Sequence, residues 1–115
     1  PTPPSHILTI GSLSLNTRTY EATVAGKRTL LTPVEFALLY HLMAHAGEIL
    51  SPERLLREVW NFPHDSGSPD LVRLHTKNLR AKIEPDPSHP KYIRTVRRYG
   101  YTIPLDPSVA DVVSH

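Results

Sequence analysis

The segment Ser68–Ile83 restricts the possible folds most, because it combines a helix start signal, a helical pattern and several cations. Ser68 can accept a hydrogen bond from a free backbone N–H of the first turn. Pro69 suits the first helical position, where its missing N–H costs nothing. Pro85 disfavours helical geometry at the residue before it. The segment is therefore predicted to be one helix that ends near Ile83.

At about 100° per residue, the predicted helix has two faces of different chemistry. One stripe is expected to pack inward: Val72, Thr76, Leu79 and Ile83. The opposite ridge is mostly uncharged: Asp70, Leu74, Lys77, Asn78 and Ala81. This ridge is flanked on one side by Arg73 and Arg80, and on the other by His75 and Lys82. A helix in the major groove needs this distribution, because base edges lie ahead of it and phosphates beside it. An ordinary amphipathic helix with a solvated basic face would show the same pattern.

A second basic segment follows this helix. The pattern of Tyr92–Ile103 predicts two short strands around a tight turn near residues 98–100. Three arginines cluster around the expected tip: Arg94, Arg97 and Arg98. A basic helix followed by a basic hairpin is typical of a winged helix.

The net charge of +2 conceals an uneven distribution. Residues 71–103 contain eight Lys or Arg and two acidic residues, which is a net charge of +6. The other residues contain five Lys or Arg and nine acidic residues, which is a net charge of −4. A basic block on an otherwise acidic domain indicates an anionic partner on one side.

Several segments, in this order, resemble the effector domain of OmpR/PhoB-type response regulators: Leu31–Leu39, Leu50–Trp60, Leu79–Glu84, Tyr92–Arg97 and Gly100-Tyr101. The resemblance covers roughly residues 7–103. The motifs are specific because they occur together and in order, whereas any one alone would be weak. The resemblance implies sequence-specific binding of double-stranded DNA by the transcription-regulating output domain of a two-component system.

The expected fold is α+β: a winged helix-turn-helix over residues 7–104, with three helices and a C-terminal β-hairpin wing. It begins with a four-stranded antiparallel sheet whose strands are separated by turn signals: Ile7–Ile10, Leu13–Leu15, Tyr20–Val24 and Arg28–Leu31. Residues 1–6 form a proline-rich linker, and residues 105–115 a flexible tail without a clear pattern.

Two helices are predicted upstream of the basic one. Thr32 to Glu35 form a capping box with proline at the first helical position, and Ser51-Pro52 opens the next helix in the same way. Gly47 is the expected C′ residue of the first helix, and residues 48–50 are expected to add a short strand. The inner faces are predicted as Phe36, Leu39, Tyr40 and Met43 in the first helix, and Leu55, Leu56, Val59 and Trp60 in the second.

The resemblance also assigns roles within the basic region. Lys77 and Asn78 occupy positions where family members often contact bases or phosphates, and Arg80 matches a phosphate contact. Leu74 matches a groove-facing position that can touch a thymine methyl group, and Arg97 matches the wing arginine of the minor groove. By charge and position, further DNA contacts are expected from Arg73, Lys82, Arg94 and Arg98.

The chain departs from the family pattern at three positions. Asp70 stands where a basic residue is common, so a phosphate contact there is not expected. Asn78 replaces an arginine, which shifts the preferred base from guanine toward adenine. Arg98 replaces a wing glycine, so a turn that needs a positive φ would be strained and the hairpin is expected to be built differently.

The connector of residues 61–67 is longer than the turn of a plain helix-turn-helix. In the resembling family this loop contacts RNA polymerase, and that role is expected of Asn61, Phe62, Pro63, His64 and Asp65. A solvated connector is the alternative.

Other classes of function find little support. The sequence has no cysteine, no phosphate-binding glycine-rich loop, no hydrolase or zinc-peptidase motif and no long apolar run. His41 and His45 are one turn apart but have no third ligand nearby, so both are expected to be exposed and solvated. We expect a cytoplasmic protein without enzymatic activity, cofactor, metal or membrane contact.

The resemblance implies particular partners. They are double-stranded DNA with direct repeats bound by a tandem homodimer, RNA polymerase, and a receiver domain preceding this region. An RNA-binding or protein-interaction winged helix is the alternative, because the same fold serves those functions.

Overall fold

The computed structural model describes residues 6–63 and 67–106. Within these ranges the chain begins with an antiparallel sheet of β1 (Ile7–Ile10), β2 (Leu13–Asn16), β3 (Glu21–Val24) and β4 (Lys27–Leu30), in chain order. The three helices α1 (Pro33–Ala44), α2 (Pro52–Glu58) and α3 (Pro69–Ile83) follow, and then the hairpin of β5 (Arg94–Val96) and β6 (Gly100–Thr102). The winged-helix prediction is therefore confirmed.

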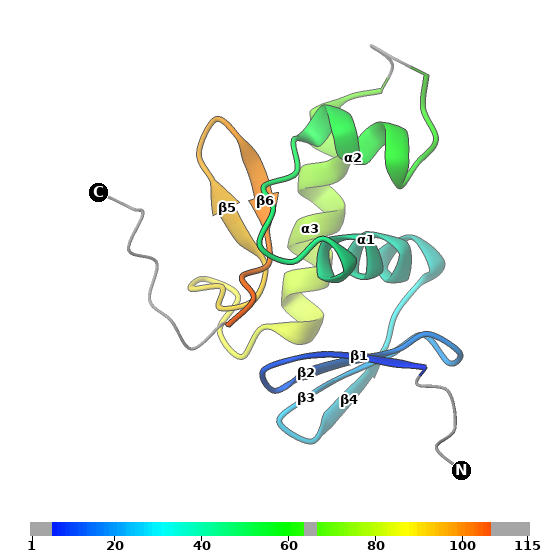
Figure 1. The fold of residues 1–115 in the computed structure, drawn as a ribbon, viewed down its shortest axis with the longest axis vertical. Coiled ribbons are helices and arrows are strands. Elements are labelled where there is room, and N and C mark those ends of the chain that lie inside the picture. Colours follow the sequence, from blue (N-terminus) through cyan, green and yellow to red (C-terminus); the bar gives the residue numbers. More distant parts are fainter. Residues whose placement is uncertain (1–5, 64–66, 107–115) are drawn as a thin grey trace.

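The helices and the hairpin are arranged around α3 (Figure 1). The four-stranded sheet lies at the C-terminal end of α3, and α2 lies toward its N-terminal end. The predicted inward stripe of α3 is buried as expected: Val72, Thr76, Leu79 and Ile83. Val72, Leu79 and Ile83 pack into one core with side chains from the sheet, α1, α2 and the hairpin.

The third strand begins one residue later than predicted, because Tyr20 has a φ of 64°. That value lies in the left-handed region, which bulky residues rarely adopt. The Asn16 side chain accepts hydrogen bonds from the backbone N–H groups of Arg18 and Thr19, which builds the turn. Tyr20 therefore ends a tight turn and does not begin a strand.

The capping box of α1 is present as predicted. Thr32 Oγ1 accepts from the Glu35 N–H at 3.2 Å, and Glu35 Oε1 accepts from the Thr32 N–H at 2.9 Å. The predicted inner face is wrong at Tyr40, which is 43% exposed, because the helix turns its leucines inward. The buried apolar residues of α1 are Leu38, Leu39, Leu42 and Met43.

Tyr40 instead stacks on Phe36, with ring centroids 5.9 Å apart, and Phe36 stacks on Tyr20 at 4.1 Å. Gly47 is not the C′ residue, because α1 ends at Ala44 with His45 as its cap. The Gly47 N–H donates to Ile103 O at 2.8 Å and so joins the turn after α1 to the residue that follows β6.

The second helix starts at Ser51 as predicted, where Oγ accepts from the Arg54 N–H at 3.1 Å. It ends earlier than its apolar pattern suggests, so Val59 and Trp60 lie beyond it and are half-buried. The Trp60 and His75 rings meet in a T-shaped arrangement, with centroids 5.5 Å apart, and thereby link the end of α2 to α3.

The hairpin approaches the chain before α2 very closely. Leu50 and Tyr101 exchange two backbone hydrogen bonds of 2.8 and 2.9 Å, so the strand predicted at residues 48–50 is reduced to a single bridge. A Cβ added to Gly100 would lie 2.0 Å from Leu50 O. Only glycine fits at this position.

The predicted linker (residues 1–6) and flexible tail (residues 105–115) lie mostly outside the described residues. Only His6 of the linker and residues 105 and 106 of the tail are described. In the described part of the chain, no helix is both long and apolar enough to cross a membrane.

Candidate nucleic-acid interface

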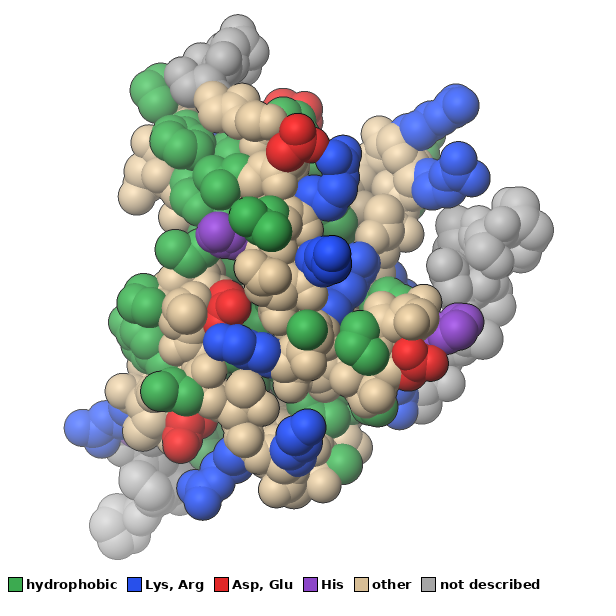
Figure 2. All heavy atoms as spheres, turned by 180° about the vertical axis from the view of Figure 1, so that it is seen from behind, with side chains coloured by type: hydrophobic (Ala, Val, Ile, Leu, Met, Phe, Trp, Pro, Cys, Tyr) green, Lys and Arg blue, Asp and Glu red, His purple; other side chains and the backbone are tan. Residues whose placement is uncertain are grey.

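The ridge of α3 that was predicted to face outward is exposed along its whole length: Asp70, Leu74, Lys77, Asn78 and Ala81. Leu74 is 53% exposed although it is apolar. Figure 2 shows Lys and Arg side chains along this face and at the tip of the hairpin. A narrow ridge with a protruding apolar side chain and cations beside it has the shape and charge that a DNA groove accepts.

At the N-terminal end of the ridge, Asp70 forms an ion pair with Arg73, which lies one turn further along α3. Both side chains are well exposed, at 77% and 70%. The Ser68 hydroxyl accepts from the Asp70 N–H at 3.2 Å and caps the helix. The pair partly neutralises Arg73, so the basic character of this end is weaker than the sequence suggests.

Arg80 is half-buried between α3 and the hairpin. Its Nε–H donates to Ile93 O at 3.1 Å, and its Nη2–H donates to Thr95 Oγ1 at 2.7 Å. Burial lowers the pKa of Arg80 from its ordinary value, although an arginine side chain stays protonated in proteins. Arg80 therefore joins the helix to the hairpin, a contact that helical spacing could not reveal.

Lys82, the other flanking cation, lies at the C-terminal end of α3 beside the sheet. Its Nζ donates to Glu35 Oε1 at 2.6 Å and to Leu30 O at 3.3 Å. Burial acts to raise the pKa of Glu35, but the hydrogen bonds from Lys82 and Thr32 hold it below its ordinary value. This ammonium is engaged by β4 and α1, so the structure does not bring it together with the exposed ridge.

The tip of the hairpin carries Arg97 and Arg98, and both are exposed. Arg98 has a φ of 72°, and the Tyr99 N–H donates to Val96 O at 3.0 Å to close the turn. The expectation of a differently built turn is wrong, because an arginine adopts the left-handed conformation that glycine would favour. Arg94 is half-buried, and its Nε–H donates to Lys91 O at 3.1 Å.

Glu84 anchors the segment between α3 and the hairpin, a role that the sequence did not indicate. The carboxylate is buried and accepts from the backbone N–H groups of Lys91, Tyr92 and Ile93, at 2.7 to 3.2 Å. Three N–H groups converging on one carboxylate fix the start of the hairpin relative to the end of α3. An acid at the end of a helix, in the run Glu84-Pro85-Asp86-Pro87, gives no pattern that would have predicted this.

The connector after α2 is described at Asn61, Phe62, Pro63 and Gly67, while His64 and Asp65 lie outside the described residues. Asn61 and Pro63 are exposed, whereas Phe62 is half-buried against the core. The Phe62 ring leaves no room for a side chain at Gly67, where a Cβ would lie 2.6 Å from it. Phe62 thus holds the loop to the domain and leaves its neighbours on the surface.

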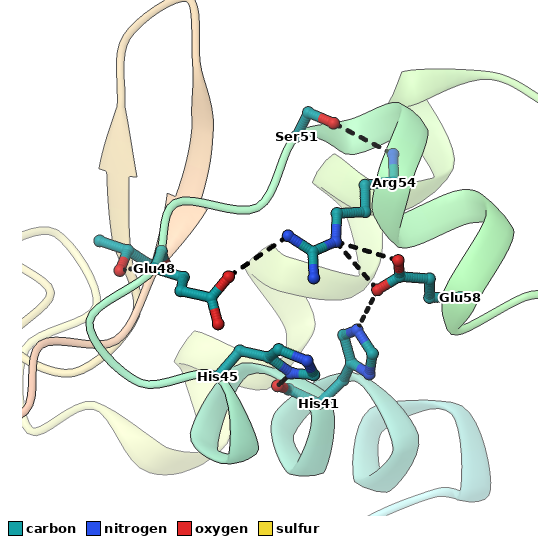
Figure 3. Close-up of polar contacts among 7 residues, drawn as sticks. His41, His45, Glu48, Ser51, Arg54 and Glu58 are labelled. Carbon is teal, nitrogen blue, oxygen red and sulfur yellow. Dashed lines mark hydrogen bonds and ion pairs between the residues drawn. The ribbon is translucent and has the colours of Figure 1, made fainter.

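His41 and His45 are not the solvated pair that was expected (Figure 3). His41 Nε2 lies 2.6 Å from Glu58 Oε1, and its side chain is only 19% exposed. Arg54 Nε–H also donates to Glu58, at 3.0 Å, and Arg54 Nη1 lies 3.4 Å from Glu48 Oε1. The prediction failed because the Glu58 side chain of α2 reaches His41 on α1, a contact that sequence periodicity does not reveal.

This network joins α1, α2 and the turn between them. Burial acts to raise the pKa of Glu58, but the hydrogen bonds from His41 and Arg54 hold it below its ordinary value. Among the residues that the structure describes, no group of three or more His, Cys, Asp or Glu side chains could hold a metal ion.

A family model described as "Transcriptional regulatory protein, C terminal" matches residues 26–103, which include all three helices and the hairpin. The chain belongs to this family. Membership agrees with the geometry, because the matched region contains the exposed ridge of α3 and the basic tip of the hairpin.

Curated relatives of this transcriptional-regulator family resemble the chain closely. The chain is 41% identical over 101 residues to the DNA-binding dual master transcriptional regulator RpaA of Synechocystis, covering 88% of this chain and 42% of RpaA. It is 36% identical over 98 residues to the DNA-binding response regulator MtrA of Mycolicibacterium smegmatis, covering 85% of this chain and 42% of MtrA. The chain thus spans less than half the length of these relatives.

Solved structures of similar fold include the Thermotoga maritima response regulator DrrB, an OmpR/PhoB homologue. It matches with a TM-score of 0.76 and 32% identity, over 87% of this chain and 45% of DrrB. The DNA-binding domain of RstA from Klebsiella pneumoniae, in complex with the RstA box, matches with a TM-score of 0.77 and 26% identity. That match covers 88% of this chain and 99% of the RstA domain.

As a member of this family, the chain is a C-terminal DNA-binding domain of the OmpR/PhoB type. The comparisons support DNA binding over the RNA-binding or protein-interaction winged helix.

Proposed function

We propose that the domain binds double-stranded DNA in a sequence-specific manner, with α3 in the major groove and the hairpin in the adjacent minor groove. The single observation that carries this proposal is the exposed ridge of α3 beside the exposed arginines of the hairpin tip (Figure 2). In the major groove, the proposed contacts are Arg73, Leu74, Lys77 and Asn78. In the minor groove they are Arg97 and Arg98.

Asn78 is proposed to read a base directly. Its side chain is exposed on the ridge, and a carboxamide can donate to adenine N7 and accept from the adenine N6 amino group. Leu74 lies one turn earlier and is exposed, so it can contact a thymine methyl group. Lys77 on the ridge and Arg73 on its flank are cations, and we propose that they contact phosphates. Phosphate contacts carry no direct sequence information.

The test starts by selecting bound sequences from a random duplex pool and then measures affinity for single-base variants of the best site. Asn78→Ala should relax preference at one base pair and lose about 1–3 kcal/mol on the best site. Lys77→Ala serves as the comparison and should weaken all variants alike. If Asn78→Ala also weakens the whole panel uniformly, α3 is docked in a different rotation and the proposed groove face is wrong.

In the intact protein, we propose that a receiver domain precedes this domain and that phosphorylation controls the pairing of two copies on direct repeats. Supporting this, relatives more than twice as long are described as response regulators.

We propose that the intact protein is located in the cytoplasm and that its pairing on DNA can be tested directly. Sedimentation with duplexes carrying one or two half-sites tests the pairing, and a single copy on the double site would contradict it.

The loop after α2 is proposed to contact RNA polymerase through residues 61–65. The exposure of Asn61 and Pro63 supports this. Replacing the loop by Pro63→Gly, His64→Ser and Asp65→Gly together should leave DNA affinity intact and lower transcription in a reconstituted assay. Equal loss of both would count against the proposal.

A further inference from the structure

Arg80 contacts both strands of the hairpin at one cross-strand pair. Thr95 of β5 lies opposite Tyr101 of β6 in the strand register. The guanidinium donates to the Thr95 hydroxyl, and its Cζ lies 6.0 Å from the centre of the Tyr101 ring. A further hydrogen bond reaches Ile93 O, immediately before β5. One side chain of α3 thus holds the hairpin at its start and across its width.

We propose that Arg80 is a positioning residue, which sets the orientation of the hairpin relative to α3 and thereby places Arg97 for the minor groove. Only Val96 separates Thr95 from Arg97, so a change in the strand at Thr95 moves the tip directly. This proposal rests on the proposed function, because it assumes that α3 and the hairpin occupy neighbouring grooves.

The chemistry of the contact requires arginine. A guanidinium is planar and presents its N–H groups in a fixed fork, so bonds from Nε and Nη2 define a direction as well as a distance. A lysine ammonium carries the same charge on a flexible stem and cannot reproduce two bonds of fixed relative geometry. The half-buried position of Arg80 strengthens both bonds, because water competes less for the donors.

Other contacts hold the hairpin to different parts of the domain. The backbone bridge between Leu50 and Tyr101 ties β6 to the segment before α2, and Glu84 ties residues 91–93 to the end of α3. Arg80 acts between these two attachments, on the strand that leads to the tip. The angle between α3 and the outer part of the hairpin therefore depends on Arg80.

A direct phosphate contact by Arg80 is the competing role. A guanidinium that uses two N–H groups for the hairpin still has others that could bind a phosphate. The variants must therefore separate the effect of losing the Arg80 charge from the effect of losing its bonds to the hairpin. Arg80→Lys keeps the charge and removes the fork, whereas Arg80→Met removes both and keeps the aliphatic packing. Thr95→Val removes one acceptor and leaves Arg80 in place. Arg57→Lys, at an exposed position of α2, is the matched control for the chemical change.

The experiment has two readouts on the same purified domain. Amide hydrogen exchange of β5 and β6 is measured without DNA, and affinity is measured for two duplexes that differ only by an A-tract where the hairpin binds. An A-tract has a narrow minor groove that attracts arginine, so preference for it reports on Arg97. The exchange rates and the A-tract preference are compared between wild type and these variants: Arg80→Lys, Arg80→Met, Thr95→Val, Arg57→Lys, Arg97→Ala and the Arg80→Lys/Arg97→Ala double variant.

We expect Arg80→Lys to speed exchange in β5 and β6 on the order of tenfold. It should also remove most of the A-tract preference while leaving the salt dependence of binding unchanged. Thr95→Val should act in the same direction, and Arg57→Lys should change neither readout. Arg97→Ala should add little to Arg80→Lys, because the two would act on the same preference.

Wild-type exchange and preference in Arg80→Lys, with a reduced salt dependence in Arg80→Met, would show that Arg80 is a phosphate contact and would overturn the proposal. If Arg97→Ala itself keeps the A-tract preference, the minor-groove placement in the proposed function is wrong. The exchange data then still decide whether Arg80 positions the hairpin. Thermal unfolding of each variant separates these effects from loss of the fold.

Discussion

Lys82 Nζ lies 2.6 Å from Glu35 Oε1, so the last turn of α3 is tied to the first turn of α1. Glu35 is 8% exposed, and Lys82 is 32% exposed. A carboxylate that is taken out of water needs such a partner, because an unpaired buried charge is costly. The ion pair fixes how α3 packs on the rest of the domain.

Lys77→Ala and Lys82→Ala are expected to act on different properties, although both remove a cation from α3. Lys77 is exposed on the ridge, so its loss should reduce the slope of log K against log salt by about one unit and leave stability nearly unchanged. Loss of Lys82 leaves the Glu35 carboxylate without its partner and should lower the free energy of unfolding by about 1–3 kcal/mol. Salt titration of DNA binding and urea unfolding measure the two effects. A reduced salt slope in Lys82→Ala would establish Lys82 as a DNA contact.

The Glu35 carboxyl should make stability depend on pH in the acidic range. Its pKa in the folded domain lies below the ordinary value of 4.5. A depressed pKa contributes stability that is complete above the unfolded value and is lost as pH falls through the folded value. The difference in unfolding free energy between wild type and Glu35→Gln should therefore be constant near pH 7 and shrink as pH falls below 4.5. Urea unfolding at several pH values measures it, and a difference that grows toward low pH would contradict the assignment.

Gly100→Ala should destabilise the domain through a clash with the main chain. The added Cβ would meet Leu50 O at 2.0 Å, and backbone atoms cannot move aside as a side-chain end can. We expect the free energy of unfolding to fall by about 2–3 kcal/mol and the hairpin to become more mobile. Gly26→Ala is the matched control, because Gly26 also has a positive φ but nothing lies within 4 Å of the added Cβ. Equal losses for the two variants, in thermal or urea unfolding, would show that backbone conformation alone is responsible.

Arg98→Gly should stabilise the fold and weaken DNA binding at the same time. With a φ of 72°, Arg98 holds a conformation that is unfavourable for residues with a Cβ. Glycine removes that strain but is more flexible when unfolded, so the net gain should be about 0.5–1 kcal/mol. The lost cation should lower affinity for all sequences, with a smaller salt slope.

Arg98→Asn separates the two effects, because asparagine tolerates the left-handed region and is uncharged. It should share the loss of affinity seen with Arg98→Gly. If Arg98→Gly lowers stability in urea unfolding, the turn is not strained at this position.

The sequence by itself determined where α3 begins and which of its faces is buried. Pro69 after Ser68 marks the helix start, and the spacing of Val72, Thr76, Leu79 and Ile83 shows which face is inside. These signals are local, because capping depends on adjacent residues and burial follows the period of the helix. The exposed position of Asn78 follows from the same period.

Only the tertiary structure decided which charged side chains remain available. Arg80 and Lys82 carry the same charge as Lys77 in the sequence, but Thr95 and Glu35 engage them across distances of 15 and 47 residues. His41 likewise finds its partner, Glu58, 17 residues away on α2. Helical periodicity gives the direction of a side chain but not what is packed opposite it, because that depends on how the hairpin, the sheet and α2 fold against the helices.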